Sequence, residues 1–181
     1  EELFWKKDEV KKVIEPDEFW KDPTYIEQFA GNIYVFDREQ SEIWKYPVLT
    51  DSFGARRRWL AAGITPDLTK VVDMKVVGDV WLLTETGKIE RYSRGAPVNF
   101  SMEGFPAKGE SKKFVNPVAV WATDSLIYVL ESGASRVVVF NDDGKYESQY
   151  VNSEFSKAQD LVVVDDKAYV LIDNVVKEFG L

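Results

Sequence analysis

The stretch Gly31-Asn32-Ile33-Tyr34-Val35-Phe36-Asp37 sets an aromatic residue inside a short apolar run, and three later stretches of the chain have the same form. These are Gly78-Asp79-Val80-Trp81-Leu82-Leu83-Thr84, Ser125-Leu126-Ile127-Tyr128-Val129-Leu130-Glu131 and Asp166-Lys167-Ala168-Tyr169-Val170-Leu171-Ile172. The central aromatic residues of the four stretches are 47, 47 and 41 positions apart. A repeat of this length decides the fold, because each unit of a repeat protein buries its apolar surface against neighbouring units.

A second short element follows each stretch and ends in an aromatic residue 10 to 12 positions beyond the first one. All four copies have a β-branched residue, two variable positions and an aromatic residue: Ile43-Trp44-Lys45-Tyr46, Ile89-Glu90-Arg91-Tyr92, Val137-Val138-Val139-Phe140 and Val176-Lys177-Glu178-Phe179. Turn-forming residues such as Glu85-Thr86-Gly87 and Asp173-Asn174 separate the two elements. Two short apolar runs around a polar turn predict a β-hairpin.

Each hairpin is expected to have a further strand before it, and the first three are expected to have another after it. The preceding strands are Tyr25–Phe29, Val72–Val76, Val118–Trp121 and Leu161–Val164, and the following ones are Arg57–Ala61, Val98–Met102 and Lys145–Val151. Units of four antiparallel strands at a period of about 45 residues are typical of β-propeller blades. The sequence therefore predicts an all-β propeller with four-stranded blades at residues 22–66, 67–113, 114–157 and 158–181, and strands of a preceding or closing blade in residues 1–21.

Two helical turns are expected, at Asp17–Lys21 and Ser153–Lys157, where Val13–Lys21 resembles Gln149–Lys157. In both copies an outer strand ends in a turn that carries Glu-Phe. We expect Phe19 and Phe155 to fill the gap between blades before the next inner strand begins.

The ends of the chain leave two ways to complete the ring. In one, Asp8–Glu15 supplies the outer strand of the last blade and closes a four-bladed ring, which removes the exposed sheet edges. In the other, the chain is the final part of a larger ring, and Leu3–Trp5 pairs with Asp8–Glu15 in a remnant of an upstream blade. The second is favoured because Val176–Phe179 already provides the third strand of the last blade, and because the first residue is Glu1 rather than Met. On this hypothesis the rest of a longer polypeptide completes the ring, and the isolated chain self-associates.

The composition excludes several kinds of chemistry. The 181 residues contain no His and no Cys, which excludes disulfides, thiolate metal sites and the Ser-His-Asp triad. The net charge of −8 argues against non-specific nucleic-acid binding. No apolar run approaches the roughly 18 residues of a membrane span, so we expect no direct membrane contact from this segment. No glycine-rich phosphate loop is present, and no cofactor is expected.

Two aspartates are candidates for a site at the central channel. Asp73 and Asp160 each lie at the start of an innermost strand, and those strands line the channel of a propeller. Tyr25 and Asn116 occupy the corresponding places in the other two blades. Several carboxylates there could hold a hard cation such as Ca²⁺. The alternative, which we favour, is that each aspartate accepts backbone N–H groups and fixes the loop that enters its strand.

A second candidate is the basic run Arg56-Arg57-Arg58-Trp59, which lies near Trp44 and Tyr46 in the same predicted blade. Arginine beside aromatic residues can grip an anionic partner, and this makes Arg57 and Trp59 weak candidates for ligand binding. The favoured interpretation is a solvated outer strand, where charge prevents edge-to-edge aggregation.

The strand pattern resembles NHL-type and related six-bladed bacterial propellers, notably at Asp142–Lys145 and at Asn116-Pro117-Val118-Ala119-Val120. More closely, it is similar to the C-terminal propeller of membrane-anchored bacterial proteins with an upstream PPM-type phosphatase-like domain. The residues behind this second resemblance are Ala30–Asp37 with Ile43–Tyr46, Asp73–Trp81, Tyr92-Ser93-Arg94-Gly95, Val137–Phe140 and Asp160-Leu161-Val162-Val163. It implies a membrane-tethered, extracytoplasmic location, although the lack of Cys fits the cytoplasm equally well. No phosphatase metal motif is present in the chain.

These observations favour a non-catalytic binding or sensor module that recognises a protein, a peptide or a glycan through a propeller face. The alternative is a hydrolase or lactonase-like enzyme with a divalent metal at the channel mouth. Such an enzyme would need convergent carboxylate and amide ligands, and carboxylates would do most of its acid–base work because no His is present.

Overall fold

The computed structural model describes residue 14 and residues 18–104 and 114–181. Across this part of the chain, the secondary structure is almost entirely β, with a single five-residue 3₁₀ helix, η1 (Ser153–Lys157). The expected strands Leu3–Trp5 and Asp8–Glu15 lie outside the described residues, apart from Ile14. The observed strands are β1 (Pro23–Phe29), β2 (Asn32–Asp37), β3 (Glu42–Tyr46), β4 (Arg57–Arg58), β5 (Val71–Val77), β6 (Asp79–Thr84), β7 (Ile89–Ser93), β8 (Ala96–Val98), β9 (Pro117–Ala122), β10 (Leu126–Glu131), β11 (Arg136–Asn141), β12 (Tyr146–Val151), β13 (Ala158–Val164), β14 (Lys167–Ile172) and β15 (Val175–Gly180).

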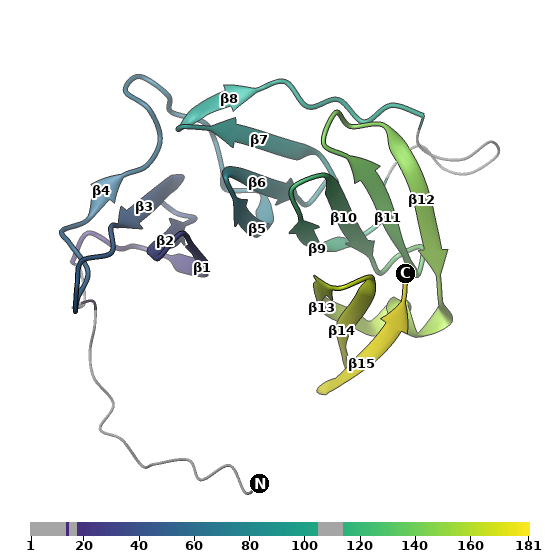
Figure 1. Cartoon of the computed structure of the whole chain (residues 1–181). Coiled ribbons are helices and arrows are strands. Elements are labelled where there is room, and N and C mark those ends of the chain that lie inside the picture. The colour runs from purple at the N-terminus through teal and green to yellow at the C-terminus, as the bar shows by residue number, and fades with distance from the viewer. Residues whose placement is uncertain (1–13, 15–17, 105–113) are drawn as a thin grey trace, which may run out of the picture.

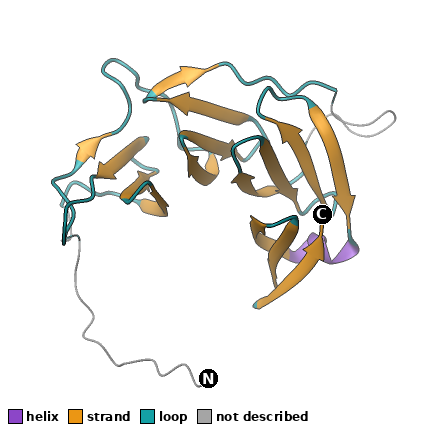
Figure 2. Ribbon diagram, viewed as in Figure 1, coloured by secondary structure: helices purple, strands orange, loops and turns teal. Residues whose placement is uncertain are grey.

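The strands form four antiparallel sheets in which each strand pairs with the next one along the chain. The sheets are β1–β4, β5–β8 and β9–β12, with four strands each, and β13–β15, with three. The first strands of successive sheets lie side by side, so that the sheets are arranged around a common centre as propeller blades (Figures 1 and 2). The all-β propeller fold is therefore confirmed, and we number the blades 1 to 4 in chain order.

The register of the sheets confirms the aromatic repeat. Tyr34, Trp81, Tyr128 and Tyr169 each occupy the third position of the second strand of their blade. Each faces the third residue of the four-residue motif on the next strand. The first strand of every blade also has one extra residue, a β-bulge, at the same place. The residue after the bulge pairs with the fifth residue of the second strand. These positions are Tyr25, Asp73, Ala119 and Asp160.

The expected outer strands of blades 1 and 2 are partly wrong. Strand β4 ends at Arg58 rather than Ala61. Beyond this point the carbonyl groups of Ala61 and Ile64 accept hydrogen bonds from the Arg58 guanidinium instead of pairing in the sheet. Strand β8 spans Ala96–Val98 rather than the expected Val98–Met102, and it starts early because Arg94 and Gly95 both adopt positive φ, with values of 51° and 82°. Positive φ at both central residues is the geometry of a type I′ turn, which allows pairing to resume at once.

The hydrophobic core lies between the blades. Blade 2 sends Met74, Val80 and Leu82 toward blade 1, whereas Trp81 and Leu83 point to blade 3. Alternate residues of each strand thus serve two different interfaces, as the two-residue period of a strand requires. We call the face that packs on the preceding blade the leading face and the face that packs on the following blade the trailing face.

An apolar residue seals each interface from the connector that enters the blade. Leu68, Phe114 and Phe155 each lie three residues before the first residue of the inner strand, and all three are buried. The Phe155 ring lies 4.8 Å from that of Phe179, and the Phe114 ring lies 6.5 Å from that of Phe140. These residues close the joints between neighbouring blades.

In blade 1 the sealing position belongs to Trp20, whose ring meets that of Tyr46 edge-on at 6.1 Å. The expectation that Phe155 fills a gap is confirmed, but the matching expectation for Phe19 is wrong by one residue. Phe19 is 55% exposed, whereas Phe155 is 2% exposed.

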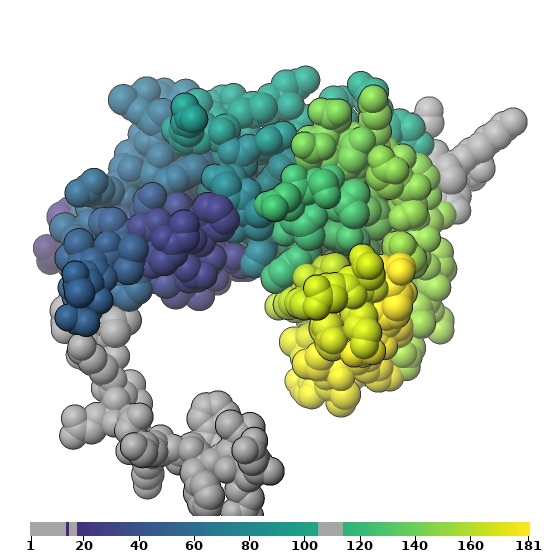
Figure 3. Space-filling model, viewed as in Figure 1, coloured from purple at the N-terminus to yellow at the C-terminus, as the bar shows by residue number. Residues whose placement is uncertain are grey.

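Within the described part of the chain, the four blades form an open arc rather than a closed ring. Contacts join β1 to β5, β5 to β9, and β9 to β13, but no contact of similar extent joins β13 to β1. Figure 3 shows the same separation between the first blade and the last one.

The sealing role of Phe155 gives a first prediction. We expect Phe155→Ala to lower the free energy of unfolding by about 3–5 kcal/mol, because the ring is buried between blades 3 and 4. The matched control Phe19→Ala should cost no more than about 1 kcal/mol, since that ring is exposed and has the Arg56 guanidinium stacked on it. Urea denaturation measures both values, and equal losses would contradict the assignment.

Candidate functional site

A cavity of about 200 Å³ lies where the four inner strands meet. Every blade contributes to its walls, through three neighbouring residues of β1, β5 and β13 and two of β9. The lining residues are Tyr25, Ile26, Glu27, Asp73, Met74, Lys75, Val120, Trp121, Asp160, Leu161 and Val162. The cavity is the channel of the propeller, and it is the candidate functional site.

The structure brings three of the six predicted site residues to this cavity: Tyr25, Asp73 and Asp160. The expected position of Asn116 is wrong, because Ala119 occupies the equivalent place in blade 3. Asn116 instead adopts a positive φ of 53°, and its side chain bonds to Ser132 at the β10–β11 turn. It therefore shapes the connector that enters β9.

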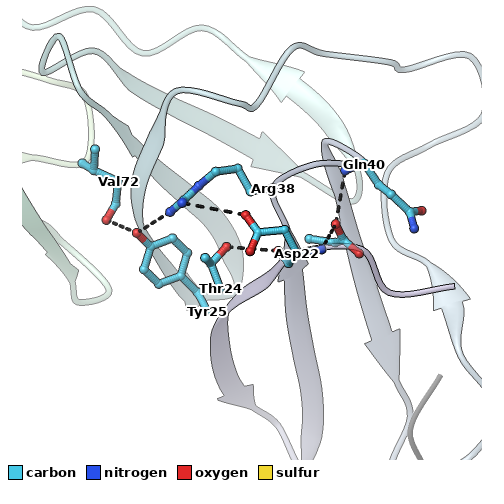
Figure 4. Close-up of polar contacts among 7 residues, drawn as sticks. Asp22, Thr24, Tyr25, Arg38, Gln40 and Val72 are labelled. Carbon is cyan, nitrogen blue, oxygen red and sulfur yellow. Dashed lines mark hydrogen bonds and ion pairs between the residues drawn. The ribbon is translucent and has the colours of Figure 1, made fainter. Parts of the chain in front are cut away.

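Tyr25 ties blade 1 to blade 2. Its hydroxyl donates to the backbone carbonyl of Val72 and accepts a 3.3 Å hydrogen bond from Nη2 of Arg38 (Figure 4). Arg38 is in turn 3.9 Å from the carboxylate of Asp22. Burial raises the pKa of Tyr25 above its ordinary value, although the charge of Arg38 opposes the shift. The hydroxyl thus stays protonated and keeps its donor role.

Asp73 ties blade 2 to blade 3. One carboxylate oxygen accepts the backbone N–H of Met74 at 2.8 Å, and the other accepts that of Val120, in the next blade, at 2.7 Å. Burial raises the pKa of Asp73 to about 7, and the nearby carboxylates of Asp160 and Glu27 add to the rise, while the two N–H bonds oppose it. The favoured interpretation of Asp73, as an acceptor of backbone N–H groups, describes its geometry.

Asp160 makes one of the two backbone hydrogen bonds that Asp73 makes. Its Oδ1 accepts the N–H of Leu161 at 2.7 Å, as Oδ1 of Asp73 does with Met74. Its Oδ2 has no hydrogen-bond donor among the described residues, and the residue is exposed. Asp160 therefore presents an unneutralised carboxylate to the channel.

A second row of residues crosses the channel two positions further along the inner strands. Nζ of Lys75 lies 2.8 Å from a carboxylate oxygen of Glu27 and 3.8 Å from the ring centroid of Trp121. Sequence reasoning did not identify this row. For two members the signal available was the strand period, because residues two apart share a face and Glu27 and Lys75 follow the predicted channel positions Tyr25 and Asp73 by two. Trp121 follows Ala119, which was not predicted to lie at the channel.

Arg57 and Trp59 do not belong to the channel site. Arg57 is exposed on the outermost strand of blade 1, and Trp59 follows that strand. The Trp59 ring packs edge-on against Tyr34, at 6.4 Å between centroids, at the border of the core between blades 1 and 2. Packing therefore accounts for Trp59, and Arg57 is a solvated edge residue.

In the part of the chain that the structure describes, no three His, Cys, Asp or Glu side chains gather in a way that could hold a metal ion. In the same residues, no helix has the length and apolar character needed to cross a bilayer. The expectation that the protein uses no catalytic metal stays a prediction.

The pKa of Asp73 leads to a second prediction. Because burial raises this pKa from 3.8 to about 7, the folded protein keeps a proton that the unfolded chain has already released. The contribution of this proton to the free energy of unfolding is fully present below about pH 4 and declines as the pH rises toward 7. Asp73→Asn keeps an acceptor oxygen but cannot ionise. The free energy of unfolding of the variant should therefore gain about 1.4 kcal/mol per pH unit relative to wild type between about pH 5 and 7.

Urea denaturation across this pH range measures the difference. Asp143→Asn, at an exposed carboxylate in the β11–β12 turn, serves as the control and should follow the wild-type profile. Parallel profiles for Asp73→Asn and wild type would show that the Asp73 carboxyl titrates normally.

Comparison with known proteins extends the description of the fold. No protein-family model and no curated protein matches the chain. Among solved structures, the computationally designed protein Ika4 has a TM-score of 0.60 at 11% identity, covering 96% of this chain and 99% of its own. A streptogramin B lyase has a TM-score of 0.55 at 16% identity, covering 88% of this chain and 54% of its own. The glutaminyl cyclase of Myxococcus xanthus has a TM-score of 0.54 at 9% identity, covering 86% of this chain and 72% of its own.

The chain thus spans about half the length of the lyase that it resembles. At these identities the likeness concerns the fold alone, and two of the three similar proteins carry enzyme names whereas the third is a design. The chain has the fold of a β-propeller.

Proposed function

We propose that the protein is a non-catalytic binding module whose channel cavity takes up a basic group of a protein or peptide ligand. One observation carries the proposal. The cavity contains the carboxylates of Asp73 and Asp160, and no lysine or arginine of the described residues forms an ion pair with either of them. The lysine that lines the cavity, Lys75, is already paired with Glu27.

The charge balance of the cavity supports a cationic ligand. Glu27 and Lys75 neutralise each other at 2.8 Å, and both are largely buried. The exposed carboxylate of Asp160 then remains, together with the half-buried carboxyl group of Asp73, whose pKa is about 7. An ammonium or guanidinium group would compensate this negative charge and donate a charge-assisted hydrogen bond to Oδ2 of Asp160.

The contact between Lys75 and Trp121 favours a peptide over a glycan as the ligand. Sugars commonly stack on exposed aromatic faces, but a face of Trp121 is occupied by the Lys75 ammonium group at 3.8 Å. A glycan would have to displace this cation–π contact, whereas a cationic side chain can enter beside Asp160 without disturbing it.

The enzyme alternative has one observation in its favour, the pKa of Asp73 near 7, which suits a general acid or base. Both oxygens of Asp73, however, accept backbone N–H groups, and this gives the carboxylate a role in joining two blades. The finer likeness to NHL-type propellers beside a PPM-type domain, with a membrane-tethered location, is kept as part of our proposal. It rests on the sequence motifs.

The proposal predicts that basic tripeptides bind in the channel. Gly-Lys-Gly and Gly-Arg-Gly should shift the indole ¹⁵N–¹H signal of Trp121, which Trp121→Phe identifies, whereas Gly-Glu-Gly should not. A cation favours the ionised form of Asp73, so the affinity should rise between about pH 6 and 8. Nuclear magnetic resonance titrations at both pH values measure this.

Two variants define the site in the same experiment. Asp160→Asn should weaken binding several-fold, and the control Asp143→Asn, which removes an exposed carboxylate away from the cavity, should not. Equal shifts with the acidic tripeptide, or no shift with any tripeptide, would overturn the proposal. Shifts of the Trp121 signal by millimolar Ca²⁺ or Mg²⁺ alone would favour the metal-dependent alternative.

A further inference from the structure

The inner strand of blade 1 lacks the cover that its equivalents have, although Val35 and Tyr46 on the same leading face are buried. Met74, Val120 and Leu161 occupy one position of the inner strands of blades 2, 3 and 4, and they are 2%, 2% and 1% exposed. Ile26 occupies this position in blade 1 and is 68% exposed. Nothing about the residue type explains the difference, since all four side chains are apolar. Among the described residues, no blade packs against the Ile26 side of β1.

The trailing face of blade 4 shows the same contrast. Ile43, Ile89 and Val137 begin the four-residue motif of blades 1, 2 and 3, and they are 0%, 3% and 0% exposed. Val176 begins this motif in blade 4 and is 65% exposed. Each end of the arc therefore exposes an apolar residue, Ile26 or Val176, whose counterparts in the other described blades are buried.

A hydrogen bond that joins blades 2 and 3 also has an equivalent acceptor in blade 4, which has no donor among the described residues. Oδ2 of Asp73 accepts the N–H of Val120, which lies in the following blade. Asp160 is the equivalent of Asp73 in blade 4, and its Oδ2 has no donor in the described part of the chain. The equivalent of Val120 in blade 1 is Ile26, so the two open faces carry the acceptor and the donor of one bond.

We propose that two copies of this chain associate head to tail, with the trailing face of blade 4 packed on the leading face of blade 1 of the second copy. The occupant is a second copy because the two open faces are complementary halves of an interface that the chain already forms three times within itself. The contact places Val176 against the partner's blade 1, and it aligns Asp160 Oδ2 with the backbone N–H of the partner's Ile26. Contacts between unlike faces are heterologous, and the rotation between neighbouring copies decides whether they form a closed ring or an open chain of copies.

Sedimentation velocity of the 181-residue chain over a wide concentration range tests this proposal. Wild type should associate as the concentration rises, and either Ile26→Glu or Val176→Glu should weaken the association at least tenfold, because each places a charge in the interface. The matched control is Val151→Glu, at a 68% exposed valine of the outer strand β12, which lies on neither open face. Circular dichroism checks that each variant keeps its β structure.

Mixing the two end-face variants gives a sharper test. The Ile26→Glu chain keeps an intact trailing face and the Val176→Glu chain keeps an intact leading face, so a mixture should associate although neither variant does so alone. A contact between two identical faces would not be rescued by mixing. A wild-type chain that stays monomeric at every concentration, or association that neither variant weakens, would overturn the proposal.

Discussion

The packing of one blade face on the next is the interaction on which the rest of this structure depends. A single blade is a twisted sheet of three or four short strands with apolar residues on both faces, and it cannot bury either face by itself. Three interfaces provide this burial, each sealed by an apolar residue of the connector, and they hold the core of the protein. The aromatic repeat of the sequence is a direct consequence, because every blade must present the same shape to its neighbour.

The same packing builds the channel. Tyr25 and Asp73 lie at one position of their inner strands, and each bonds to the backbone of the following blade. Ala119 cannot do so, and Asp160 has no following blade in the described residues to bond to. The polar groups of the cavity are therefore partly joints between blades and partly free to meet a ligand. Burial against the next blade gives Asp73 its raised pKa, whereas Asp160 lies exposed.

The sequence was sufficient to predict the fold, the inner three strands of each blade and the equivalence of the four aromatic residues, because these features recur and are buried. The outer strands could not be delimited as well, since an edge strand has no buried face to set an apolar pattern, and β4 shows this with two exposed arginines. Asn116 was misplaced because Ala119, the true equivalent of Asp73, is apolar and therefore carries no polar signal in the sequence. Phe19 was confused with Trp20 because two large apolar residues stand side by side. The Glu27–Lys75–Trp121 row was missed because its members belong to three different strands, and no motif links them.

Amide hydrogen exchange of the dilute, monomeric chain tests the central role of blade packing most directly. If burial between blades stabilises the structure, amides of β6 and β10, whose blades are covered on both faces, should exchange slowest. Amides of β14 should exchange faster than those of β10, although the two strands are equivalent and both pair with a strand on either side. Equal protection of β10 and β14 in the monomer would show that each blade is stable by itself, and it would contradict this account.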